Sequence, residues 1–145
     1  MHTIIAASIM TMVATLLSAV SATPITTDNT LETANVDSNH ATLSSGRFTY
    51  YYPGLGACGM LNGDGDLVVA LSHVDFDPHT PNGNPNHNSL CGRRLRAFYS
   101  GKSVEVTVVD RCPSCNSGDL DLSPAAFSHL ADLSVGTFRG TWNWI

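Results

Sequence analysis

Two aspartates beside hydrophobic stretches are the residues of this chain best suited to acid chemistry or ligand binding. Asp110 follows three alternating valines, so a strand there would turn its carboxylate toward the apolar core. Asp121 lies between two leucines, where burial would raise its pKa and suit it to act as a general acid. Structural roles compete with both interpretations. Asp110 could cap the following turn or pair with Arg111, and Asp121 could bond to the start of the next helix.

Further candidates for ligand contact surround these two residues in the sequence. Asp119 falls on the same side as Asp121 if the stretch is extended, and because it is nearer the preceding loop we expect it to be solvated. Aromatic rings near the carboxylates would provide a flat surface for sugar rings, and alternation along residues 48–52 should turn Tyr51 or its neighbours outward. The aromatic candidates are Tyr50, Tyr51, Tyr52, Trp142 and Trp144.

The four cysteines predict two disulfide bonds. Of the three possible pairings we favour Cys58 with Cys91 and Cys112 with Cys115, the second closing a short loop. A zinc site built from all four thiolates is the rival, although Cys58 and Cys91 lack the paired spacing of zinc knuckles. A redox role for Cys112 and Cys115 would require the pair to open a helix, and a Gly-Asp segment follows instead.

Charge and composition argue against several classes of partner. The chain has a net charge of -5, part of which lies in a polar segment near the N-terminus, so nucleic acid is not an expected partner. Arg93, Arg94 and Arg96 form a basic patch of the kind that solubilises an edge strand. Asp64 and Asp66 lack the ligand ladder of a calcium-binding loop. We therefore expect no metal site and no cofactor.

The N-terminal segments predict export. An apolar run followed by small residues indicates a signal peptide over residues 1–22, since the run is shorter than the roughly 20 residues of a membrane span. Residues 23–45 are polar and lack hydrophobic periodicity, which predicts a disordered spacer. Residues 46–145 have the length of one folded domain. We expect a secreted monomer, located outside the cell or in the cell wall, with no membrane partner.

The folded part has mainly strand patterns. Alternating or continuous apolar residues predict strands over 48–52, 67–71, 95–99, 104–109 and 137–145. One helix is predicted, with Ser123 as its N-cap, Pro124 in its first turn and its end near Leu133. The Asn- and Pro-rich residues 79–89 predict a mobile surface loop. Short strands with a short helix indicate a mainly β protein built as a small barrel or sandwich.

Six motifs follow one another along the predicted folded part. They are Gly46-Arg47-Phe48-Thr49-Tyr50-Tyr51, Ala57-Cys58-Gly59, Val68-Val69-Ala70-Leu71, Leu90-Cys91-Gly92-Arg93, Val108-Val109-Asp110-Arg111-Cys112-Pro113 and Gly118-Asp119-Leu120-Asp121-Leu122-Ser123-Pro124. In this order they resemble the single-domain expansin-like proteins called loosenins, within the barwin-like, rare lipoprotein A-like double-psi β-barrel superfamily. The likeness covers the whole predicted folded part. It implies a six-stranded double-psi β-barrel with one or two short helices, stapled by disulfides and carrying a shallow polysaccharide groove.

The resemblance assigns site residues position by position. The groove threonine of expansins falls on Thr49, the strand-end aspartate on Asp110 and the acid-like aspartate on Asp121. Two positions depart from the family pattern: a tyrosine found in many expansins is here Cys112, and the base carboxylate of related endoglucanases is here Pro53. Because an inverting glycosidase needs both an acid and a base, we do not expect ordinary hydrolysis.

The leading functional hypothesis is non-hydrolytic binding and loosening of β-glucan or chitin in cell walls. The glycan contacts would be Thr49, Tyr51, Asp110, Asp119 and Asp121. One alternative is inhibition of papain-like cysteine proteases, with residues 79–89 as the inserted loop. The other is lytic glycan cleavage, in which Asp121 acts as a single acid, with Asp110 as the second carboxylate, and a sugar hydroxyl attacks.

Overall fold

The structure is a computed structural model that describes residues 42–145. The predicted signal peptide, residues 1–22, lies outside the described residues, as does most of the predicted spacer. The first strand begins at Ser44, two residues before the predicted start of the domain, because Ser44 and Ser45 pair with Trp142 and Thr141. Polar composition alone did not reveal this pairing.

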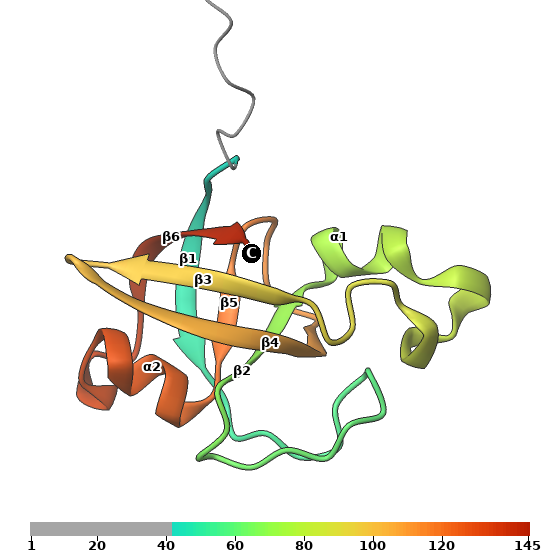
Figure 1. Ribbon diagram of the computed structural model, residues 1–145, viewed down its shortest axis with the longest axis horizontal. Helices are drawn as coiled ribbons and strands as arrows, with labels where there is room; N and C mark the ends of the chain where they lie inside the picture. Colours follow the sequence, from blue (N-terminus) through green and yellow to red (C-terminus); the bar gives the residue numbers. More distant parts are fainter. Residues whose placement is uncertain (1–41) are drawn as a thin grey trace, which may run out of the picture. The chain divides into compact units, whose positions relative to one another are not determined.

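Six strands form a closed barrel in the order β1-β5-β2-β4-β3-β6 (Figure 1). The β1/β5 and β2/β4 pairs are parallel and the other four pairs are antiparallel. This confirms the predicted six-stranded double-psi barrel. The strands are β1 Ser44–Tyr50, β2 Val68–Ser72, β3 Arg94–Tyr99, β4 Lys102–Cys112, β5 Leu120–Leu122 and β6 Phe138–Trp144.

The barrel interior is filled by alternate residues of the strands and by one helix. All five residues of β2 are buried, as its continuous apolar run predicted. Helix α2, Pro124–Leu130, begins as predicted, with the Ser123 hydroxyl accepting the Ala126 N–H. It contributes Phe127, which packs on Phe138, and it ends at Leu130, earlier than predicted, before the 3-10 turn η4, Leu133–Val135.

A short helix and three 3-10 turns connect β2 to β3. They are α1 His73–Phe76, η1 Asp77–His79, η2 Pro81–Gly83 and η3 Pro85–His87. The segment predicted as a surface loop contains one buried polar residue, Asn88. Its side-chain amide donates to the Phe76 carbonyl at 2.7 Å and to the Thr80 hydroxyl at 2.8 Å. Asn88 therefore fixes this segment against α1 and η1.

Both predicted disulfides are present, Cys58–Cys91 and Cys112–Cys115. Because all four sulfur atoms are oxidised, the rival zinc site of four thiolates is excluded. The first disulfide joins the loop between β1 and β2 to the segment before β3, which stabilises the connections around the barrel. Among the described residues, no helix is long and apolar enough to cross a membrane.

Candidate functional site

A bulge between β2 and β4 determines where Asp110 points. Val69 pairs with Val108, but the next residue, Ala70, pairs with Asp110, so Val109 is an extra residue in β4. Ala70 lies outside the main core, and its partner Asp110 shares that outer face. The prediction that Asp110 faces the core was wrong, because an extra residue reverses the alternation that follows it.

The bulge completes a row of outward-facing residues across four neighbouring strands. Thr49 of β1 pairs with Asp121 of β5, Asp121 pairs with Ala70 of β2, and Ala70 pairs with Asp110 of β4. Tyr51 and the second disulfide pack against the small side chain of Ala70. We call this surface the carboxylate face; its residues are Thr49, Tyr51, Ala70, Asp110 and Asp121.

Asp121 has a half-buried carboxylate with one hydroxyl partner. The Thr49 hydroxyl donates to its Oδ1 at 2.7 Å. Burial raises the pKa of Asp121, the Thr49 hydrogen bond and the Arg47 charge oppose this shift, and the charge of Asp110 adds to it. The raised pKa agrees with the prediction made from the flanking leucines. Asp121 does not cap the following helix, because Ser123 does so.

Asp110 is oriented by backbone amides rather than by a side-chain cation. Its Oδ1 accepts the N–H groups of Ala57 and Arg111, each at 2.8 Å. The Arg111 guanidinium instead pairs with Asp77 at 2.6 Å. The two amides hold the Asp110 carboxylate at the edge of the carboxylate face, where it can accept hydrogen bonds from a ligand.

Tyr51 lies between the two carboxylates. Its hydroxyl is buried and has no hydrogen bond of good geometry to the described residues. Burial raises the pKa of Tyr51, and the charges of Asp110 and then Asp121 raise it further. The Asp110 carboxylate, the nearby acceptor, adds to this shift even though its geometry falls short of a full hydrogen bond. A buried hydroxyl without a partner is uncommon in folded proteins. The Tyr51 hydroxyl is enclosed beside the two acids, so a ligand can use it as a donor only if the surrounding side chains move.

Asp119 is a structural residue, contrary to the expectation that it would be solvated. Its side chain is buried and accepts the N–H of Arg47 at 2.7 Å and that of Asn116 at 3.0 Å. These bonds tie β1 to the loop before β5. The sequence could not show this burial, because Arg47 is far from Asp119 along the chain.

The predicted aromatic residues are divided among different surroundings. Tyr50 packs on Phe127 and Trp142 is buried, so both belong to the core. Tyr52 is exposed, and Trp144 lines a pocket that contains no residue of the carboxylate face. Tyr51 is the one aromatic candidate that packs within the carboxylate face.

The loop from Pro53 to Asn62 carries a feature that sequence reasoning missed, and we call it the leucine loop. Leu55 and Leu61 form a β-bridge, yet their side chains are 75% and 79% exposed. The middle of the loop is held by the Cys58–Cys91 disulfide. Two isolated leucines in a Gly-rich stretch could have indicated the feature. Exposed apolar groups on an anchored loop are typical of interaction surfaces.

The sulfur atoms of Cys112 and Cys115 lie within 4.8 Å of a carboxylate oxygen of Asp121. Metal ions bind cysteine as a thiolate, and these two sulfur atoms form a disulfide. The cluster therefore does not offer the donors that a metal centre requires.

Comparisons with known proteins agree with this barrel. A family model described as lytic transglycolase matches residues 79–142. The chain is 39% identical over 105 residues to the papain inhibitor of Streptomyces mobaraensis, a match that covers 70% of this chain and 71% of that protein. The chain belongs to the double-psi β-barrel superfamily. The solved Streptomyces papain inhibitor matches this double-psi barrel with a TM-score of 0.66 and 37% identity, over 72% of this chain and 94% of that one.

The chain is also similar to an expansin and to an EG45-like protein. An expansin of Clavibacter michiganensis, solved as a mutant in complex with cellohexaose, matches with a TM-score of 0.58 and 27% identity. This match covers 72% of the present chain and 50% of the expansin. An EG45-like domain containing protein of Citrus jambhiri is 28% identical over 120 residues, which cover 73% of this chain and 85% of that protein.

Proposed function

We propose that the protein is secreted and binds β-linked cell-wall polysaccharide, β-glucan or chitin, through the carboxylate face, loosening the wall without hydrolysis. The observation that carries this proposal is the row from Thr49 through Asp121 to Asp110, with the unpartnered Tyr51 hydroxyl between the two acids. A related expansin has been solved with cellohexaose. Two disulfides also suit an extracellular protein.

The chemistry of the face suits binding better than hydrolysis. Asp110 offers an acceptor held by two amides, whereas Asp121, with its raised pKa, can carry a proton and donate it to a sugar oxygen. Pro53 stands where related endoglucanases have their base, so no carboxylate at that position can activate water. Sugar hydroxyls would exchange hydrogen bonds with both acids, and the chain would lie across Tyr51.

A sedimentation assay with microcrystalline cellulose and with chitin tests this proposal. We expect wild type to bind one of them and Asp121→Asn to bind at least about tenfold more weakly, because a hydrogen bond to a charged group contributes about 1.5–3 kcal/mol. Asp77→Asn is the matched control, because Asp77 is exposed and lies outside the carboxylate face. Absence of binding, or equal loss in both variants, contradicts the proposal. Anhydro-sugar products in the supernatant would show that the protein cleaves the glycan lytically and does not merely loosen it.

A second candidate function is inhibition of papain-like cysteine proteases. It is favoured by the match to the Streptomyces papain inhibitor over 94% of that chain, together with the leucine loop. The sequence-based hypothesis places the inserted loop at residues 79–89, which are mostly polar. The leucine loop is better suited, since its exposed apolar side chains could fill apolar subsites of a protease.

Papain inhibition assays separate the two functions. We expect the double variant Leu55→Ser, Leu61→Ser to inhibit at least about tenfold more weakly, because two apolar contacts would be lost. The control Val135→Ser changes an exposed apolar residue outside the leucine loop and should inhibit like wild type. Asp121→Asn should retain inhibition while losing glycan binding. If wild type does not inhibit papain, or if Val135→Ser weakens inhibition equally, this second function is excluded.

A further inference from the structure

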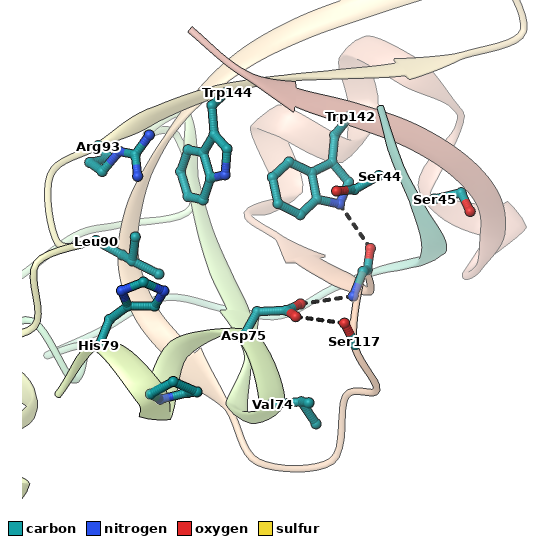
Figure 2. A pocket seen from close by; sticks show the side chains of 12 residues that line it. Ser44, Ser45, Val74, Asp75, His79, Leu90, Arg93, Ser117, Trp142 and Trp144 are labelled. Carbon is teal, nitrogen blue, oxygen red and sulfur yellow. Dashed lines mark hydrogen bonds between the residues drawn. The ribbon is translucent and has the colours of Figure 1, made fainter. Parts of the chain in front are cut away.

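A pocket separate from the carboxylate face lies between the end of β6, the start of β1 and the α1–η1 segment (Figure 2). Its volume is about 620 Å³, within the usual range of small-ligand sites. No residue of the carboxylate face lines it. We call it the tryptophan pocket; the lining residues used below are Asp75, His79, Arg93, Ser117, Trp142 and Trp144.

One side of the tryptophan pocket is fixed by internal hydrogen bonds. Asp75 accepts the Ser117 hydroxyl at 2.6 Å, the Gly118 N–H at 2.8 Å and the Ser72 hydroxyl at 2.9 Å. The Trp142 indole donates to the Gly118 carbonyl at 2.9 Å (Figure 2). These groups build the pocket, and most of the acceptor capacity of Asp75 is already used.

The opposite side holds a cation with unused donors. The guanidinium carbon of Arg93 lies 4.1 Å from the ring centroid of Trp144. Within residues 42–145 Arg93 has no acidic partner, whereas Arg94 and Arg96 both pair with Glu105. The ring of His79 lies on the same side of the pocket (Figure 2). Stacking on Trp144 therefore holds a guanidinium at the pocket with its planar donors free.

We propose that the tryptophan pocket binds an acidic sugar, whose carboxylate pairs with Arg93 and whose ring packs beside Trp144. A guanidinium matches a carboxylate with two parallel hydrogen bonds, and an indole provides the apolar surface that a sugar ring contacts. Free donors exceed free acceptors here, because the Asp75 oxygens are already bonded. A uronic acid residue of a polysaccharide supplies both the anion and the ring. This site is independent of the carboxylate face.

Calorimetric titration with tetragalacturonic acid and with its uncharged methyl ester tests the proposal. At about 0.15 M salt, where interactions between distant charges are screened, we expect the acid to bind at least about tenfold more tightly than the ester, because charge-assisted hydrogen bonds would be lost. Arg93→Gln should lose this preference. Arg94→Gln removes the same charge at the neighbouring residue and should keep it.

Two control variants separate binding at the tryptophan pocket from binding at the carboxylate face. Asp121→Asn should bind tetragalacturonic acid like wild type, and Arg93→Gln should bind cellulose or chitin like wild type. The proposed function can therefore fail while this site survives, and the reverse also holds. Equal affinity for acid and ester, no binding of the acid, or equal losses in Arg93→Gln and Arg94→Gln would overturn the proposal.

Discussion

Asp121 of the carboxylate face and Asp75 of the tryptophan pocket differ in how many hydrogen bonds their carboxylates accept. Asp75 accepts three hydrogen bonds from segments around it, whereas Asp121 accepts one, from Thr49, and burial raises its pKa. The first carboxylate holds the chain together. The second has bonding capacity left for a ligand. Unused donors and acceptors, rather than residue type, therefore indicate where each surface can bind.

The largest expected effect is on the structural aspartate. Asp75→Ala should lower the free energy of unfolding by about 2–3 kcal/mol, because it leaves the Gly118 N–H and two hydroxyls without their acceptor. Asp77→Ala is the matched control, since its ion pair with Arg111 is exposed and worth less than about 1 kcal/mol. Urea denaturation measures both. Equal losses would remove the distinction between the two regions.

Removing the Tyr51 hydroxyl should affect binding without lowering stability. In Tyr51→Phe a buried hydroxyl without a good partner disappears, so the free energy of unfolding should stay the same or rise. Polysaccharide binding should weaken about two- to tenfold, the value of one neutral hydrogen bond. Tyr52→Phe, at an exposed tyrosine, should change neither quantity. Lower stability with unchanged binding would show that the Tyr51 hydroxyl is structural.

The pH dependence of stability should identify Asp121. Because its pKa is raised on folding, the folded state binds the proton more tightly, and wild type should lose stability as pH rises through that pKa. Asp121→Asn removes this loss, so it should be more stable than wild type at neutral pH. The difference should vanish below the ordinary aspartate pKa. Urea titrations across this range would contradict the assignment if the difference were constant or shrank as pH rises.

The smallest effect concerns the single partner of Asp121. The Thr49 hydrogen bond lowers the pKa of Asp121, so Thr49→Val should raise that pKa further. Carbon-13 NMR of the Asp121 carboxyl group measures the change. Thr141→Val, on β6, should leave the pKa of Asp121 where it is. A lowered or unchanged pKa in Thr49→Val would show that the hydroxyl does not stabilise the carboxylate.

Local patterns predicted the elements well and the positions of particular side chains less well. The start of α2 was predictable because Ser123 and Pro124 act within one turn of the helix. Strand β5 is only three residues long, too short for a hydrophobic period, and it was not predicted as a strand. The burial of Asp119 depends on Arg47, which is distant in sequence. Tertiary pairing, which no local window contains, decided these cases.

The sequence by itself indicated the barrel through family motifs and predicted the raised pKa of Asp121 from its adjacent leucines. It favoured one of three disulfide pairings, which the structure then showed to be present. Only the tertiary structure decided that Asp110 joins Asp121 on the outer face, since an extra residue in β4 reverses the alternation. It also decided the tryptophan pocket, because Asp75, Arg93 and Trp144 meet only when the barrel closes. Periodicity is a property of one segment, whereas a site combines segments that the chain keeps far apart.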